Sequence, residues 1–213
     1  MLELKGIRKS YDRNVIFEDV NISFKEGTVT CFAGHNGCGK STMLKVIGGL
    51  IPKDAGEIVS DRRMKFAYVP EKFPAVNMKG RAYLKHMAKI DGIYSEKEQD
   101  EIIGRFAEDF FLTEMLDKQM KDMSKGTLQK IGVIQALMCD PDVLLLDEPL
   151  SGQDADSQEV FIKKILDLKK KQKIILLSAH EKNLIEVLSD RIYTIEKGKV
   201  ILCNEETKQE GSR

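Results

Sequence analysis

The sequence has no apolar run long enough to cross a membrane as a helix. A spanning helix needs about 18 or more predominantly apolar residues, whereas the longest apolar runs, at residues 143–146 and 174–177, are only strand-sized. The N-terminal residues, MLELKGIRKSY, carry charges from residue 3 onward and contain no apolar core of signal-peptide length. We therefore expect a soluble chain whose role at a membrane depends on a partner.

The sequence also lacks a charge surplus and a cysteine framework. Lys plus Arg and Asp plus Glu both number 34, so the formal net charge is zero, which argues against a nucleic-acid partner. The four cysteines form no CxxC pair and the three histidines are scattered, so we expect reduced thiols rather than a zinc site or disulfides. No repeat or low-complexity linker interrupts the 213 residues.

What the sequence does contain is an alternation of strand and helix patterns. Strands are expected at residues 20–24, 28–33, 65–69, 143–146, 174–178, 192–195 and 200–202. Helices are expected at residues 40–50, 127–139, 156–170 and 181–188. This order predicts an α/β core with a largely parallel sheet covered on both faces.

Residues 73–123 differ from this alternation. Tyr83, Met87 and Ile90 have the spacing of one helix face. Ser95 begins a capping box, with Glu three residues later, for a second helix. We interpret the stretch as a mostly helical insertion in the core.

Residues 34–41 read GHNGCGKS, a full match to the phosphate-loop motif G-x-x-x-x-G-K-[ST]. Glycines let the chain curl so that backbone N–H groups point at a polyphosphate. Lys40 would reach the β- and γ-phosphates, and the Ser41 hydroxyl could ligate Mg²⁺. The motif lies between an apolar strand and a helix, which favours nucleotide binding over a chance glycine-rich turn. The candidate nucleotide-binding residues are Gly34, Asn36, Gly37, Cys38, Gly39, Lys40, Ser41 and Thr42.

Residues 143–149 read VLLLDEP, an apolar strand that ends in two acids. Buried charge is costly unless it is paired or bound to a metal. Beside a phosphate loop, Asp147 would hold Mg²⁺ and Glu148 would polarise the attacking water. The alternative, an ordinary strand end with solvated acids, would be favoured only if the phosphate loop were absent.

The segment MSKGTLQK at residues 123–130 resembles the signature of the ATP-binding cassette (ABC) family, whose usual form is LSGGQ. The other elements of that family appear in order along essentially the whole chain. Tyr11 lies where an aromatic residue stacks on adenine, and YVPE at 68–71 resembles the glutamine loop. LSGQD at 150–154 resembles the aspartate loop, and SAH at 178–180 ends where the switch histidine belongs.

The resemblance implies a fold and a set of partners. The fold is α/β: a phosphate-loop NTPase core with a mostly parallel sheet, an N-terminal antiparallel β part and a helical insertion at about residues 73–126. Residues 1–213 would form one ATPase domain that uses ATP and Mg²⁺. It would pair head to tail with a second ATP-binding subunit and serve a separate membrane permease chain on the cytoplasmic face of the membrane.

The resemblance also implies roles for residues outside the phosphate loop. Tyr11 would bind adenine. Ser124 and Gly126 would contact the γ-phosphate bound by the other subunit. His180 would contact the γ-phosphate and act in catalysis with Glu148. Asp154, in the aspartate loop, would also bind ATP.

Three departures from the family pattern affect these expectations. Glu71 replaces the usual glutamine, which leaves its role as a metal ligand open. Lys125 and Thr127 replace Gly and Gln in the signature, and Gln153 replaces a Leu. The SKG form of the signature and the proline–glutamate pair most resemble efflux-type cassettes, so export is expected.

Two alternatives to a transporter subunit fit less well. A soluble, non-transport ABC ATPase of translation usually carries two ATP sites in one chain, and one of DNA repair carries long coiled coils. This chain has one phosphate loop and a short insertion at residues 73–123. A small-molecule kinase would give the MSKGT segment no role.

Overall fold

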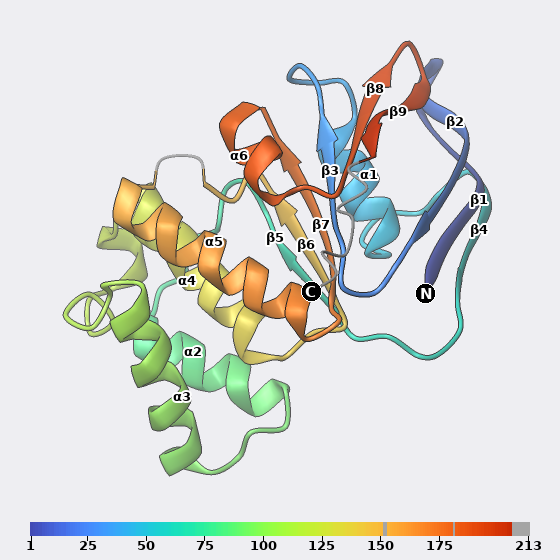
Figure 1. Cartoon of the computed structure of the whole chain (residues 1–213). Coiled ribbons are helices and arrows are strands. Elements are labelled where there is room, and N and C mark those ends of the chain that lie inside the picture. The colour runs from blue at the N-terminus through green and yellow to red at the C-terminus, as the bar shows by residue number, and fades with distance from the viewer. Residues whose placement is uncertain (151–152, 181, 206–213) are drawn as a thin grey trace, which may run out of the picture.

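The computed structural model describes residues 1–150, 153–180 and 182–205, which form two β-sheets with helices packed against them (Figure 1). The smaller sheet is antiparallel and has the strand order β2-β1-β4. Its strands are β1 (Leu2–Tyr11), β2 (Asn14–Phe24) and β4 (Ala55–Ser60). The antiparallel N-terminal part implied by the resemblance is therefore confirmed.

The larger sheet has six strands in the order β5-β6-β7-β3-β8-β9. They are β3 (Val29–Ala33), β5 (Phe66–Val69), β6 (Val143–Asp147), β7 (Ile174–Ala179), β8 (Arg191–Glu196) and β9 (Lys199–Glu205). The strands β5, β6, β7, β3 and β8 run parallel, and β9 returns antiparallel to β8 through a hairpin. The expectation of a largely parallel sheet is confirmed.

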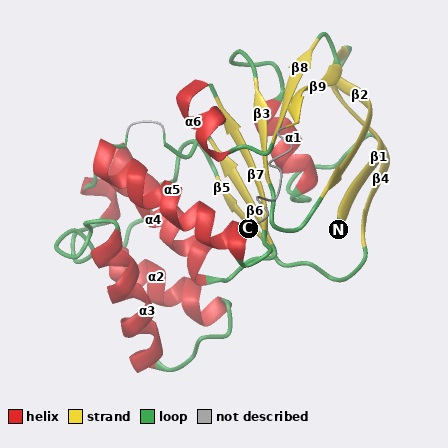
Figure 2. Ribbon diagram, in the orientation of Figure 1, coloured by secondary structure: helices red, strands yellow, loops and turns green. Residues whose placement is uncertain are grey.

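The helices divide into two groups along the chain (Figure 2). Those that alternate with strands are α1 (Lys40–Ile47), α4 (Lys125–Met138), α5 (Ala155–Lys170) and α6 (Lys182–Leu188). Between β5 and α4 come α2 (Gly80–Ile90), α3 (Glu96–Asp109) and the short 3₁₀ helix η1 (Met120–Asp122). Within the part of the chain that the structure describes, no helix has the length and apolarity to cross a membrane.

The central strands are mainly apolar because both faces of the larger sheet are covered. In β6, Leu144 and Leu146 belong to a buried cluster with residues of α4 and α5. Val143 and Leu145 belong to a second cluster, formed with α1 and the smaller sheet. Alternate side chains of a strand point to opposite faces, so a doubly covered strand reads as a continuous apolar run. The run ends where the sheet meets the candidate site, at Asp147.

The helical stretch after β5 confirms one local prediction and corrects another. Ser95 caps α3 by accepting a hydrogen bond of 3.4 Å from the Glu98 amide, as the capping box predicts. The buried face of α2, however, includes Leu84 and Ala88. Ile90, predicted to share the apolar face, is 65% exposed at the last position of the helix. The prediction for Ile90 was wrong because the buried face of α2 is the stripe of Gly80, Leu84 and Ala88, which does not include Ile90.

The predicted helix at residues 181–188 is present as α6, but Glu181 lies outside the described residues. In the same way, Ser151 and Gly152 of the LSGQD segment lie outside them.

Candidate active site

The phosphate loop connects β3 to α1 at the carboxyl end of the parallel sheet. Its last glycine, Gly39, has φ 116° and precedes the first residue of α1. A Cβ on Gly39 would lie 2.5 Å from the Ile16 Cγ2 atom. Both the left-handed backbone and the close approach of β2 therefore require glycine here. The sequence folds locally as its motif predicts, with the helix N-terminus directed at the cleft.

Lys40 is buried and directed back into its own loop. Its Nζ donates hydrogen bonds to the carbonyl oxygens of Gly34, at 2.9 Å, and His35, at 3.3 Å. The same nitrogen lies 3.6 Å from the Glu148 Oε1 atom. The Lys40 charge is therefore held between the carbonyl oxygens of the loop and the carboxylate of Glu148, a predicted catalytic residue.

Asp147 ends β6 and accepts three hydroxyl hydrogen bonds. Ser41 Oγ and Ser178 Oγ donate to Oδ1 at 2.8 and 2.7 Å, and Tyr68 Oη donates to Oδ2 at 3.1 Å. Burial, with the adjacent Asp147 charge, raises the pKa of the Tyr68 phenol well above its usual value. Tyr68 is therefore protonated at neutral pH and can act as a donor to the carboxylate.

Glu148 adopts a backbone conformation that is uncommon outside glycine, with φ 46°. Its N–H donates to Ser178 Oγ at 2.9 Å. The carboxylate Oε2 lies 2.8 Å from His180 Nδ1, while the other oxygen, Oε1, is the one near Lys40. The side chains of two predicted catalytic residues, Glu148 and His180, are thus in direct contact.

Lys40, Ser41, Glu148 and His180 help to line a cleft of about 410 Å³. It is lined by Ile16, Asn36, Gly37, Gly39, Lys40, Ser41, Thr42, Glu71, Glu148 and His180. Sequence reasoning missed Ile16 as a lining residue, because it comes from an antiparallel strand far from the motifs. It also gave no role to Tyr68 or Ser178, although both lie within segments that the resemblance had singled out.

Several predicted residues lie outside the lining of this cleft. Gly34 and Cys38 belong to the phosphate loop but do not line the cleft, and Asp147 does not line it either but accepts a hydrogen bond from Ser41, which does. Tyr11, the expected adenine-binding residue, ends β1 with half of its surface exposed. Lys9 Nζ lies 5.1 Å from the centre of the Tyr11 ring.

The oxygen atoms beside the phosphate loop suit a magnesium ion. Mg²⁺ prefers oxygen ligands and is commonly held by one or two carboxylates together with substrate phosphates. The Ser41 hydroxyl and the Asp147 carboxylate are already in contact, and Glu71 lines the same cleft. The described residues contain no cluster of three or more His, Cys, Asp or Glu side chains that could hold a metal.

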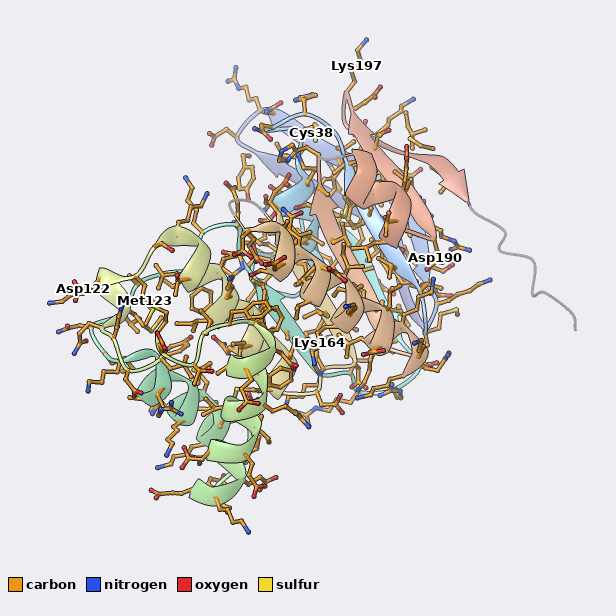
Figure 3. The ribbon with its side chains drawn as sticks, turned by 60° about the vertical axis from the view of Figure 1, so that its left-hand side comes forward. Cys38, Asp122, Met123, Lys164, Asp190 and Lys197 are labelled. Atoms are coloured by element: carbon orange, nitrogen blue, oxygen red, sulfur yellow. The ribbon has the colours of Figure 1, made fainter. Side chains whose placement is uncertain are left out.

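The signature segment begins α4 and does not line this cleft. Ser124 is the N-cap and accepts a hydrogen bond of 3.1 Å from the Thr127 amide. Figure 3 labels Met123, immediately before it, at the edge of the helical region, far from Cys38 of the phosphate loop. Within one chain, Ser124 and Gly126 therefore do not meet the phosphate loop.

Asp154, the last residue of the aspartate loop, is engaged within its own chain. It caps α5 by accepting hydrogen bonds from the Ser157 amide, at 2.9 Å, and the Ser157 hydroxyl, at 2.7 Å. Lys130 of α4 forms an ion pair with it at 2.9 Å. Ser157 first, and then Lys130, hold the pKa of Asp154 far below its usual value. The residue thereby connects the signature helix to α5.

Comparison with known proteins identifies this arrangement. Residues 17–151 match the family model for ABC transporters. The chain belongs to the ABC transporter family. It is an ATP-binding subunit of an ABC transporter, and its cassette is an ATPase.

Individual relatives span most of this ABC transporter subunit. The ABC transporter ATP-binding protein NatA of Bacillus subtilis is 30% identical over 195 residues, covering 86% of this chain and 79% of NatA. The spermidine/putrescine import ATP-binding protein PotA of Chromobacterium violaceum is 31% identical over 214 residues, covering 94% of this chain and 58% of PotA. A solved structure of the ATP-binding subunit of an ABC transporter superimposes with a TM-score of 0.86 at 27% identity, covering 94% of this chain and 88% of that one.

Proposed function

We propose that this ATP-binding subunit drives a separate membrane permease by closing head to tail with a second ATP-binding subunit around ATP. The observation that carries the proposal is the separation, within one chain, of the signature residues from the phosphate loop. Ser124 and Gly126 head α4, while Lys40 heads α1. A signature donated by a second subunit would complete each site, and pairs of cassettes are typical of ABC ATP-binding subunits.

In the proposed site, the residues around the phosphate loop bind and orient ATP. The backbone of residues 34–42 surrounds the phosphates, and Lys40 offsets their charge. Ser41 and Asp147, with Glu71, would hold Mg²⁺, which when bound neutralises phosphate charge. Tyr11, exposed at the end of β1, offers its ring to adenine.

The catalytic step falls to Glu148 and His180. The Glu148 carboxylate faces the cleft and is 13% exposed, so it can accept a proton from, or orient, a water that attacks the γ-phosphate. His180, 2.8 Å away, fixes the carboxylate and reaches the same cleft. Asp154 of the aspartate loop is proposed to bind ATP; it caps α5 and forms an ion pair with Lys130.

We further propose that residues 1–213 act as one ATPase domain in which about residues 73–126 form a helical subdomain that docks the permease. The helices α2 and α3 lie between the core strand β5 and the signature helix in the sequence, which favours this division. The subunit would sit on the cytoplasmic face of the membrane. We propose export as the direction of transport, because the SKG form of the signature and Glu71 resemble efflux-type cassettes. Import, the function for which PotA is named, is the alternative.

A mixing experiment tests the composite site. Ser124→Arg should abolish hydrolysis while its own phosphate loop still binds ATP, and Lys40→Ala should abolish hydrolysis by removing the charge on the phosphates. In a heterodimer of the two variants, one site has both Lys40 and Ser124 intact. ATPase activity and ATP-dependent pairing, measured by size-exclusion chromatography, should therefore return in the mixture.

The matched control is a chain carrying both substitutions, since mixing it with either single variant creates no complete site. Full activity of Ser124→Arg alone would contradict the proposal. So would a mixture that neither pairs nor hydrolyses ATP.

A further inference from the structure

We infer that Ser178 is a positioning residue for ATP hydrolysis, because its one hydroxyl fixes both the Asp147 carboxylate and the backbone of Glu148. Ser178 Oγ donates to Asp147 Oδ1 at 2.7 Å and accepts from the Glu148 N–H at 2.9 Å. The inference rests on the roles proposed above for these two acids. It adds a residue that touches neither nucleotide nor metal in that proposal.

The placement of Ser178 follows from the register of two neighbouring strands. Asp147 on β6 pairs directly with Ser178 on β7, at the end of the parallel sheet. Ser178 has no exposed surface. Both of its bonding partners lie on β6 or directly after it, so the hydroxyl connects the two strand ends. Two residues further along the chain lies His180, whose ring contacts Glu148.

The backbone conformation of Glu148 explains why such a bond matters. A non-glycine residue with positive φ is uncommon, and such a conformation persists only where the surroundings hold it. At Glu148 φ is 46°, and its N–H is satisfied by the Ser178 hydroxyl. This turn directs the carboxylate to its contacts with Lys40 and His180. Without the hydroxyl, the turn loses a bond that favours this direction.

Tyr68 provides an internal comparison. Its hydroxyl also donates to Asp147, but to the other oxygen, Oδ2, at 3.1 Å. The bond from the Glu148 amide goes to Ser178 and not to Tyr68. Tyr68→Phe therefore removes one donor to Asp147, whereas Ser178→Ala removes one donor to Asp147 together with the acceptor for Glu148.

The experiment compares these two variants in the full chain at saturating Mg²⁺. Loss of a residue that orients a group in a site commonly costs about 10- to 100-fold in activity. Ser178→Ala should lower kcat by about that factor while the KM for ATP changes little. Tyr68→Phe should lose less kcat. Ser178→Thr restores the hydroxyl and should recover most of the turnover, with thermal melting to check that each variant folds.

A kcat of Ser178→Ala equal to that of the original chain would overturn the inference. Equal loss of kcat in Ser178→Ala and Tyr68→Phe would also overturn it, because the effect would then arise from Asp147 alone. Failure of Ser178→Thr to recover turnover while it melts normally would do the same. Glu148→Gln is assayed beside them. If Glu148→Gln keeps full turnover, the proposed role of Glu148 fails first; if it is inactive and Ser178→Ala is unaffected, the inference alone fails.

Discussion

The side-chain amide of Gln129 donates a hydrogen bond of 2.9 Å to the carbonyl oxygen of Pro70. Gln129 is fully buried in α4, the helix that the signature begins, and Pro70 directly precedes Glu71 of the cleft. One turn further along α4, the ring of Phe73 packs closely against Gly132. Two successive contacts thus attach the segment that carries Glu71 to the signature helix.

The close approach at Gly132 predicts a stability effect. A Cβ at this position would lie 2.3 Å from the Phe73 ring, so Gly132→Ala must displace the ring. Overpacking of this kind costs about 1–3 kcal/mol, against a helix-propensity gain of roughly 1 kcal/mol. We expect a lower free energy of unfolding, measured by denaturant titration.

Gly104, in the interior of α3, is the matched control for Gly132. A Cβ there meets no atom within 4 Å. Gly104→Ala should therefore stabilise the protein by about 0.4–1 kcal/mol. Equal shifts in the two variants would show that Phe73 adjusts freely and does not secure this segment.

Glu148→Gln should keep ATP binding and lose most hydrolysis. A general base contributes about 10²–10⁴ in rate, and the amide cannot accept a proton from water. The variant should accumulate as an ATP-bound dimer in size-exclusion chromatography. The control is Glu159→Gln, which removes an exposed carboxylate paired with Lys163 on α5 and should hydrolyse ATP normally. A monomeric Glu148→Gln with normal turnover would indicate a different base.

Glu71→Gln should have opposite effects with and without Mg²⁺. The carboxylate lines the same cleft as Glu148 and the phosphate loop, so in EDTA its removal relieves repulsion and ATP should bind at least as tightly. If Glu71 helps to hold the metal, the Mg²⁺ concentration for half-maximal ATPase activity should rise about tenfold. Fluorescent-nucleotide titration and Mg²⁺ titration measure the two effects. Unchanged values in both would remove Glu71 from the metal ligands.

We expect the rate at which Cys139 is alkylated to depend strongly on pH. Burial, and then the nearby Asp91 charge, raise the pKa of Cys139 to about 11. Since the thiolate is the nucleophile, only about one Cys139 thiol in a thousand is reactive at pH 8, and the rate should rise about tenfold per pH unit toward pH 11. Cys203 is exposed and should react readily. Peptide mass spectrometry after iodoacetamide pulses measures both sites, with the denatured chain as the reference. Rapid modification of Cys139 at pH 8 would contradict the shifted pKa.

The sequence alone determined the local parts of this molecule. The phosphate loop, the apolar strands and the helix cap at Ser95 depend on neighbours within a few residues, and the structure contains them where the patterns predicted. Continuous apolar strands also predicted a sheet covered on both faces, because no exposed face would tolerate them. The order of motifs was sufficient for the family.

Tertiary structure decided what depends on strand register and on packing between distant segments. Ser178 meets Asp147 only because β7 pairs in register with β6. Ile16 lines the cleft because β2 returns beside the phosphate loop, and Ile90 is exposed because α2 packs on the core through Leu84 and Ala88. Contacts between residues far apart in the sequence leave little trace in local periodicity. The hydroxyl network around Asp147 and the carboxylate contacts of Lys40 and His180 therefore required the folded chain.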